Sequence, residues 1–334
     1  MAAGGALLLA AGFLVFSWVL LTPTASLKAG PRVFEVPAHE GVADIARRLQ
    51  GADVIRGAPA FVVLTAVRGS LRQLRAGEYE APRGASMLDV VSLLESGRVK
   101  QHPVLHPEGA TVAELARALE AQRLARAADV ARVAADPALL HRLGIEGPSV
   151  EGYLFPDTYQ FVRGMSAGEM LGRMVQRLKT KLGPELLARA RERGLSPHAL
   201  LTLASIVERE AVAPEERRLI AAVFWNRLRL DMPLQADPTV QYAVGKERAK
   251  LTRADLATDH PYNTYRRSGL PPGPIASPGL SAIEAVLDPA PVRYLYFVAL
   301  DERRHHFSTT VEEHNAAVAR YRRARSAVEP QSQR

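Results

Sequence analysis

The pattern of apolar and polar positions begins with an uninterrupted apolar run at the amino terminus. Residues 6–21 are almost wholly apolar, and no charged side chain precedes Lys28. A membrane-spanning helix needs about 20 apolar residues, so the run predicts an uncleaved, single-pass membrane anchor over residues 1–30. A cleaved signal peptide is the alternative, because Thr24-Ala25-Ser26 weakly resembles a cleavage site. No Lys or Arg precedes the run, so charge does not orient it.

Residues 31–100 change to short segments of alternating period. They predict, in order, a strand near Val33, helices over 41–50 and 58–68, a strand near 77–80 and a helix over 86–97. Ser86 is placed to cap the last helix, and Gly97 is placed to end it. The segment holds no group of catalytic residue types. This strand–helix–helix–strand–helix order therefore predicts a small binding module.

The next segment is predicted to be mainly helical. A strand comes first, Thr111 then caps a helix, and residues 114–145 have the composition of an Ala- and Arg-rich helix. Its basic positions alternate with Ala and Leu, which favours a solvated helix face. Aromatic residues do not interleave with the arginines, as a surface for single-stranded nucleic acid would require. The segment therefore argues against nucleic acid as a partner.

Composition narrows the classes of chemistry. The 334 residues are 47% hydrophobic and 23% charged, values typical of a globular protein, and the net charge is +8. Such a basic chain favours an anionic partner without choosing between nucleic acid, a lipid surface and an acidic polymer. The absence of cysteine excludes disulfides, thiolate zinc sites and cysteine nucleophiles. The motifs of phosphate-binding loops, dinucleotide-binding turns, zincins and serine-hydrolase elbows do not occur.

From residue 149 to residue 314 the loops have a different composition. Clusters of Asn, Gln, Tyr, Thr, Gly and Pro separate the predicted helices, as in MPLQADPTVQY and HPYNTYRRSGLPPGPIASPG. Loops of this kind supply the directional hydrogen bonds and ring stacking that a sugar or peptide cleft needs. The pattern therefore predicts a cleft for such a ligand in the second half of the chain.

One carboxylate in this region, Glu208, belongs to a strongly predicted helix that begins with a capping serine followed by proline. Ala204 and Ser205 share its helix face and are expected to leave room for a ligand above the carboxyl. An apolar surrounding disfavours the ionised form of a carboxyl, as a general acid requires. The alternative is an ordinary surface glutamate that pairs with Arg209 or Arg217.

The motifs of this region resemble, in their order and spacing, those of the YceG-like endolytic murein transglycosylases: EGYLFPDTY, LASIVERE, FWNRL, MPLQADPTVQY, HPYNTY, GLPPGPIASPG, YLYFVA and HHFSTTVEEHN. The resemblance covers residues 31–320. It implies an α+β fold in which the membrane helix precedes a LysM-like subdomain over 31–100 and a catalytic domain over 101–325. It also implies that Glu208, in the ASIVE motif, is the catalytic residue. The polar composition of the last residues separately predicts a disordered tail over 326–334.

The resemblance further implies a specific reaction. Members of the family cleave nascent glycan strands within the chain, between N-acetylmuramic acid and N-acetylglucosamine. Ordinary glycosidases use two carboxylates, whereas a lytic transglycosylase needs one, because the muramyl C6 hydroxyl attacks its own anomeric carbon. Glu208 would protonate the leaving oxygen and then accept the hydroxyl proton. The product is a 1,6-anhydromuramyl end, and no cofactor is expected.

Five further polar residues are candidate contacts for sugar hydroxyl or acetamido groups: Glu151, Gln235, Asp237, Asn263 and Tyr265. Glu151 precedes an aromatic turn, and a cap or turn role explains it equally well. Asp237 is also placed to cap a helix that begins at Pro238. The pattern leaves both alternatives open.

Three histidines near the carboxyl end, His305, His306 and His314, invite a metal interpretation. Their spacing fits no standard zinc pattern, so hydrogen-bonding roles are expected and no metal site is predicted. Trp225 lies within a predicted helix, where a core position is more usual than a stacking platform.

The sequence thus predicts a membrane-anchored α+β peptidoglycan lyase whose catalytic domain lies outside the cytoplasmic membrane, on the periplasmic side. Its expected partners are peptidoglycan glycan strands, the membrane and peptidoglycan synthases, but not nucleic acid. The charge of +8 would then face anionic lipid headgroups and the carboxylates of wall peptides. The alternative from another class is a non-catalytic scaffold that binds peptidoglycan within the synthesis machinery.

Overall fold

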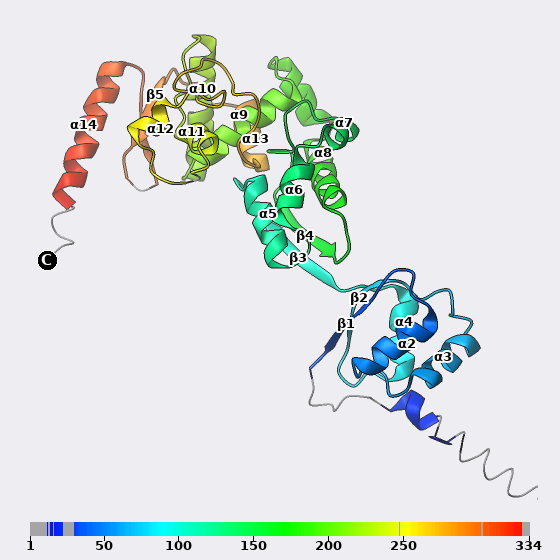
Figure 1. Ribbon diagram of the computed structural model, residues 1–334. Helices are drawn as coiled ribbons and strands as arrows, with labels where there is room; N and C mark the ends of the chain where they lie inside the picture. The colour runs from blue at the N-terminus through cyan, green and yellow to red at the C-terminus, as the bar shows by residue number, and fades with distance from the viewer. Residues whose placement is uncertain are drawn as a thin grey trace, which may run out of the picture. The chain divides into compact units, whose positions relative to one another are not determined.

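The computed structural model describes residues 12, 14–15, 17–22, 30–246, 248–301 and 303–328. Helices dominate the described residues and are accompanied by small two-stranded sheets (Figure 1), so the predicted α+β class is confirmed. The chain divides into two compact units. Unit 1 comprises residues 1–103 with 160–165, and unit 2 comprises residues 104–159 with 166–334.

Unit 1 contains the predicted order of elements. In chain order these are β1 (Arg32–Val36), α2 (Val42–Gly51), α3 (Ala58–Val67), β2 (Gly77–Ala81) and α4 (Met87–Ser96). The two strands are antiparallel, with Phe34 opposite Tyr79. The strand–helix–helix–strand–helix prediction is therefore confirmed.

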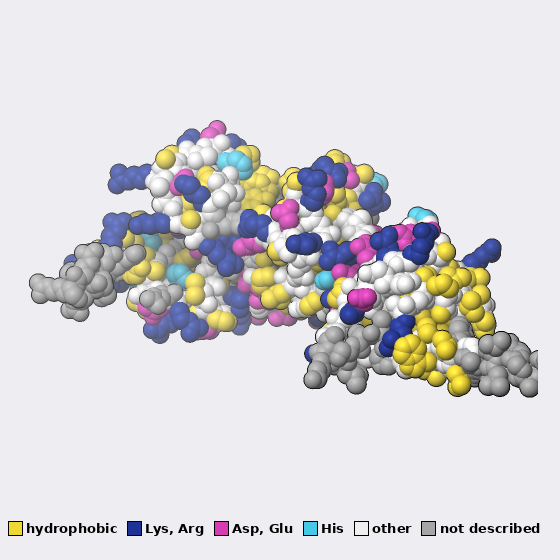
Figure 2. Space-filling model, turned by 60° about the horizontal axis from the view of Figure 1, so that its bottom comes forward, with side chains coloured by type: hydrophobic (Ala, Val, Ile, Leu, Met, Phe, Trp, Pro, Cys, Tyr) yellow, Lys and Arg dark blue, Asp and Glu magenta, His cyan; other side chains and the backbone are white. Residues whose placement is uncertain are grey.

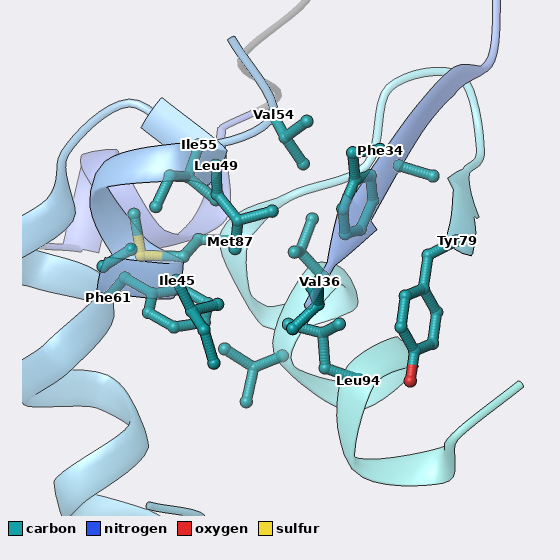
Figure 3. Close-up of a cluster of buried hydrophobic side chains, with 14 of the residues drawn as sticks. Phe34, Val36, Ile45, Leu49, Val54, Ile55, Phe61, Tyr79, Met87 and Leu94 are labelled. Atoms are coloured by element: carbon teal, nitrogen blue, oxygen red, sulfur yellow. The ribbon is translucent and has the colours of Figure 1, made fainter. Parts of the chain in front are cut away.

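The core of unit 1 lies between its sheet and its helices (Figure 3). The rings of Phe34 and Tyr79 stack with their centroids 5.7 Å apart, and the helices contribute the buried side chains of Leu49, Phe61 and Leu94. Full burial of one such side chain contributes about 1.5–3 kcal/mol. Both strands and all three helices of unit 1 thus contribute side chains to one core.

Both ends of α4 are as predicted. The Ser86 hydroxyl accepts a hydrogen bond from the N–H of Asp89, whose carboxylate accepts one from the N–H of Ser86. Gly97 follows the helix with a φ of 65°, a conformation that glycine adopts more readily than other residues. The cap and the stop are therefore local features that the sequence specifies directly.

Helix α3 departs from the usual pattern because it is apolar on all sides. Phe61 and Leu64 are buried, but Val63 and Val67 are exposed. Hydrophobic side chains gather on the surface of unit 1 in Figure 2. A surface helix ordinarily turns a polar face to water, so α3 leaves part of its apolar surface uncovered by the described residues.

The prediction of one continuous helix over residues 114–145 is wrong. After β3 (Gln101–His106) the chain forms three short helices, α5 (Val112–Ala121), α6 (Ala127–Ala134) and α7 (Pro137–Leu143). Thr111 caps α5 as predicted, but Arg123 has a φ of 56° and ends the helical path. Asp136 caps the restart at α7. Packing of α6 and α7 on a longer helix, α8 (Ala167–Glu192), overrides the uniform helix propensity of Ala and Arg.

The remaining elements of unit 2 include one buried helix, α9 (Pro197–Glu210), and the elements that follow it in the chain. They are η1 (Pro214–Glu216), α10 (Arg217–Arg229), α11 (Asp237–Ala243), α12 (Arg253–Ala257), α13 (Leu280–Leu287), β5 (Tyr296–Ala299), β6 (His305–Ser308) and α14 (Val311–Val328), while β4 (Asp157–Val162) pairs with β3. Helices α8, α10, α11 and α13 pack against α9, and residues 200–207 are buried. The end of α9, rather than its faces, is therefore the part available to a ligand.

Two terminal predictions fall largely outside the described residues. The structure does not describe most of the predicted anchor over residues 1–30, nor residues 329–334 of the predicted tail. Within the part of the chain that the structure describes, no helix combines the length and apolar character needed to cross a membrane. Helix α14 extends to Val328 and so includes the first residues of the segment predicted as a tail.

Candidate active site

The candidate catalytic residue lies at the carboxyl end of α9. At its start, the Ser196 hydroxyl accepts a hydrogen bond of 3.1 Å from the N–H of Ala199, and Pro197 occupies the first turn, as predicted. The helix ends at Glu210, so Glu208 lies in its last turn. The dipole of a helix disfavours negative charge at this end. A carboxylate here needs partners that supply compensating positive charge.

Two donors hold the Glu208 carboxyl. Arg217 Nη2 donates to Oε1 over 3.1 Å, and the backbone N–H of Gly279 donates to Oε2 over 3.0 Å. The Glu208 side chain is only 5% exposed. The ion pair with Arg217 that the simpler interpretation predicted is therefore present, but the carboxyl is nearly buried and oriented on both oxygens.

A cleft of about 420 Å³ opens beside Glu208. Its lining is mainly charged and consists of Glu108, Gly109, Glu208, Arg209, Glu210, Val212, Asp237, Pro238, Gln241, Arg248 and His305. The volume suits a small organic group, and the mixture of carboxylates and arginines can both accept and donate hydrogen bonds. Such a lining fits a polar ligand better than an apolar one.

The expected room above the preceding turn of α9 does not exist. Ala204 and Ser205 are fully buried, and the Ser205 hydroxyl accepts a hydrogen bond of 3.0 Å from the N–H of Ile275. The loop before α13 therefore occupies the space that these small residues leave. The same loop brings Gly279 to Glu208, so the small residues serve the site by admitting backbone, not ligand.

A second carboxylate lies beside Glu208 and was missed by sequence reasoning. Glu108 belongs to the loop between β3 and α5, and its Oε2 lies 3.8 Å from the same Nη2 of Arg217 that contacts Glu208. Partial burial, and then the charge of Glu208, raise the pKa of Glu108, while Arg217 opposes the rise. The N–H of Gly109 donates to the carbonyl of Ser277 over 2.8 Å, which fixes the Glu108 loop against the loop before α13.

A third carboxyl, Glu210, lines the cleft beside Asp237, which Tyr265 contacts. The Tyr265 hydroxyl donates to Asp237 Oδ1 over 2.5 Å, and the N–H of Asp237 donates to Glu210. Burial, and then the charge of Asp237, raise the pKa of Glu210 to about 8. Asp237 does not cap α11 with its side chain, contrary to the simpler interpretation. The structure thus brings together two predicted site residues, Asp237 and Tyr265, with one that was not predicted.

Glu151 has the contacts of a helix cap. Its side chain is buried, and its two carboxylate oxygens lie 3.1 and 3.2 Å from the N–H of Val112, the first residue of α5. It is not among the residues that line the cleft. A carboxylate at the amino end of a helix accepts an otherwise unpaired N–H and favours the helix dipole. These contacts support the structural role that the sequence left open.

Asn263 and Gln235 stabilise loops rather than line the cleft. Asn263 is buried, and its Nδ2 donates to the carbonyls of Leu256 and Thr258 over 2.9 and 2.7 Å. Gln235 Oε1 accepts a hydrogen bond of 3.2 Å from Arg227 Nη1. The structure therefore does not bring these two predicted residues to the catalytic candidate.

His305, His314 and Trp225 each contact other residues of the protein. His305 Nδ1 lies 2.7 Å from Glu216 Oε2, and the ring of His314 stacks on Tyr296 with centroids 5.3 Å apart. Among the described residues no group of side chains is arranged to hold a metal ion. Trp225 is half-buried, and its Nε1 donates to a carbonyl of α13 over 2.9 Å, as a residue packed between helices would.

Comparisons with known proteins agree on one family. The model of the YceG-like family matches residues 34–320. The endolytic murein transglycosylase of Bacillus subtilis is 32% identical over 329 residues, which cover 94% of this chain and 91% of that protein. The endolytic murein transglycosylase of Streptococcus pneumoniae serotype 2 is 31% identical over 350 residues, which cover 95% of this chain but 63% of that protein.

A solved structure has the same fold. The crystal structure of a yceG-like protein from Listeria monocytogenes is 35% identical in sequence and superposes with a TM-score of 0.61. The match covers 86% of this chain and 98% of the other. A solved relative therefore shares the fold over most of this chain.

Proposed function

This chain belongs to the YceG-like family, and on that premise we propose that it is an endolytic peptidoglycan lytic transglycosylase. It cleaves the bond between N-acetylmuramic acid and N-acetylglucosamine within nascent glycan strands and thereby ends their elongation. The names of the curated relatives support the reaction class. The observation that carries the proposal is the nearly buried, doubly held carboxyl of Glu208 at the edge of a charged cleft.

In the proposed reaction Glu208 acts as acid and then as base. Its O–H gives a proton to the glycosidic oxygen as the bond from that oxygen to the muramyl anomeric carbon breaks. The muramyl C6 hydroxyl then bonds to this carbon and returns its proton to Glu208, so one glycosidic bond is exchanged for the 1,6-anhydro ring without water. The attack is intramolecular, which lowers the barrier that a free nucleophile would face.

The partners of Glu208 fit the two protonation states of this cycle. Arg217 and the N–H of Gly279 stabilise the carboxylate that remains after the proton has been given. Two fixed donors also hold the carboxyl in one orientation, so it can serve the leaving oxygen and the hydroxyl in turn. Asp237, oriented by Tyr265, lines the same cleft and is proposed to bind a sugar hydroxyl or acetamido group.

The Glu208→Gln variant tests the proposal. Removal of one acid–base group costs about 10²–10⁴-fold in rate, so the variant should release almost no anhydromuropeptides from purified glycan strands, as measured by mass spectrometry. Glu192→Gln is the matched control, because Glu192 is an exposed glutamate of α8. Equal product release by wild type and Glu208→Gln would refute the proposal and favour the non-catalytic scaffold.

The domain organisation and location are proposed with the function. We propose that residues 1–30 anchor the protein in the cytoplasmic membrane, that 31–100 form a LysM-like subdomain, and that 101–325 form an extracytoplasmic catalytic domain that works beside peptidoglycan synthases. The uncharged apolar run before Lys28 and the exposed valines of α3 support a position at a lipid surface. Fusion of a reporter that is active only in the periplasm to the carboxyl end tests the topology, because a cytoplasmic domain would leave the reporter inactive.

A further inference from the structure

Glu108 and Glu208 approach a single nitrogen atom from different parts of the chain. Arg217 Nη2 lies 3.1 Å from Glu208 Oε1 and 3.8 Å from Glu108 Oε2. Within the part of the chain that the structure describes, the buried Nε of Arg217 has no hydrogen-bond partner. The guanidinium thus has one positive charge for two carboxyl groups, and a small movement would exchange its partner.

The loop before α13 fixes Glu108 at this distance. A methyl group on the Cα of Gly279 would lie 1.9 Å from Glu108 Oε1, so the carboxyl rests directly over that glycine. The N–H of the same glycine donates to Glu208. The φ of Gly279 is −76°, a value that any residue can adopt, so the backbone conformation does not require glycine here. The absence of a side chain instead allows the Glu108 carboxyl to approach closely.

Two carboxyl groups in such proximity do not ionise independently. Repulsion between the two negative charges keeps one proton on the pair to higher pH than either group would hold alone. The side chain of Glu108 is 49% exposed, so the pair has access to solvent for proton exchange. The rise in the pKa of Glu108 caused by burial and by Glu208 agrees with this geometry.

We propose that Glu108 is a positioning residue for Glu208: by competing for Arg217 and sharing one proton with Glu208, it keeps Glu208 protonated for the first step of the reaction. When Arg217 moves toward Glu108, Glu208 loses its counter-charge and retains the proton that it gives to the glycosidic oxygen. When Arg217 returns, the carboxylate left on Glu208 is stabilised. The inference rests on the proposed lyase function and adds a second carboxyl to a reaction otherwise assigned to one.

Several other charged groups face the pair and contribute to its titration. They are Arg209 and Glu210 on α9, Asp237 on α11, Arg248, and His305 on β6. None of them is altered in the variants whose kinetic pH profiles are compared below. A difference between the kcat–pH profiles of wild type and variant therefore reports the loss of the Glu108 carboxyl from the pair. This holds even if one of these other groups determines the acidic limb of the profile.

Two variants abolish the contact between the Glu108 carboxyl and Arg217 by different means. Glu108→Gln retains the size of the side chain but removes its charge, and Gly279→Ala displaces the carboxyl without changing either glutamate. Each should lower kcat for glycan cleavage about tenfold, a typical size for uncoupling two contacting charged groups, with little change in KM. The basic limb of the kcat–pH profile should move to lower pH by about one unit. Because both act on one contact, the double variant should lose little more than either single variant.

A control variant and a folding measurement distinguish a loss of the Glu108 contact from a general loss of structure. Glu192→Gln should leave kcat and the profile unchanged, and thermal unfolding should show all variants folded. A loss of kcat in Glu108→Gln with an unmoved basic limb would show a merely structural role and overturn the inference, as would wild-type kinetics. Either result together with an inactive Glu208→Gln leaves the proposed function intact. Equal activity of wild type and Glu208→Gln would instead refute the function itself.

A measurement that needs no turnover separates the inference about Glu108 from the proposed function. With ¹³C-labelled glutamate, carboxyl-carbon NMR of the wild type should show one coupled titration that extends above the ordinary range of glutamate. Its high-pH component should disappear in Glu108→Gln. Persistence of that component in the variant, after the separate signal of Glu210 has been assigned with Glu210→Gln, would contradict a shared proton.

Discussion

Glu208 Oε1 accepts a hydrogen bond of 3.1 Å from Nη2 of Arg217, the first residue of the next α-helix. An ion pair between residues nine positions apart would be unremarkable on a surface. Here both side chains are largely buried, at 5% and 15% exposure, so neither charge can be solvated freely if its partner is lost. The pair is therefore a constraint on stability as well as on the candidate chemistry.

Loss of Arg217 should destabilise unit 2. Arg217→Met leaves the Glu208 carboxyl without its charged donor, and we expect the free energy of unfolding at neutral pH to fall by about 2 kcal/mol. Arg218→Met is the control, since Arg218 pairs with Asp288 at 55% and 60% exposure and exposed pairs contribute under about 1 kcal/mol. Urea denaturation measures both. Similar losses in the two variants would mean that burial of the Glu208 pair has no energetic consequence.

Glu151 should matter for stability and not for substrate binding. Glu151→Gln weakens the contact with the N–H of Val112 and the helix dipole of α5, at an expected cost of about 1 kcal/mol. Urea denaturation should show this loss, while KM for glycan strands stays at the wild-type value. A KM several times higher in a variant of normal stability would instead place Glu151 in the substrate site.

Ser205 should act as an acceptor for backbone. Ser205→Ala leaves the buried N–H of Ile275 without its partner, and an expected loss of about 1–2 kcal/mol follows. Ser281→Ala, at an exposed position of α13, serves as the control with an expected change near zero. If Ser205→Ala changed KM but not the urea midpoint, the hydroxyl would face a ligand after all.

Glu210 should make stability fall as pH rises. Its pKa in the folded protein is raised to about 8 from an ordinary value of 4.5, so between these values the folded state binds more protons than the unfolded state. Linkage then requires the free energy of unfolding to decrease over this window and to level off beyond it. In Glu210→Gln this contribution is absent. Urea denaturation from pH 4 to pH 9 should show the wild type losing stability relative to the variant, and parallel curves would contradict the assignment.

Local features of the fold were predictable because short segments specify them. The cap at Ser86, the stop at Gly97 and the start of α9 at Ser196 each depend on hydrogen bonds or dihedral angles within a few residues. The order of elements in unit 1 followed from apolar periodicity for the same reason. The break within 114–145 was not predictable, because Ala and Arg favour helix throughout and packing on α8 decided otherwise.

The candidate site divides in the same way. Glu208 stood out through its motif and its helix, and Asp237 and Tyr265 through loop composition. Glu151, Gln235 and Asn263 have the same residue types as sugar contacts, yet each is engaged by backbone or by Arg227. Residue type and loop composition do not distinguish a side chain that faces a cleft from one that holds the loop around it.

By itself, then, the sequence determined the family, the helix that carries Glu208 and the carboxyl chemistry available there. Only the tertiary structure decided which groups surround that carboxyl. Glu108 lies 100 positions before Glu208 and Gly279 lies 71 positions after it, and neither belongs to a periodic pattern shared with α9. Their approach depends on the packing of the loop before α13 against α9, where Ser205 binds backbone, and such long-range packing leaves no periodic trace in a single chain.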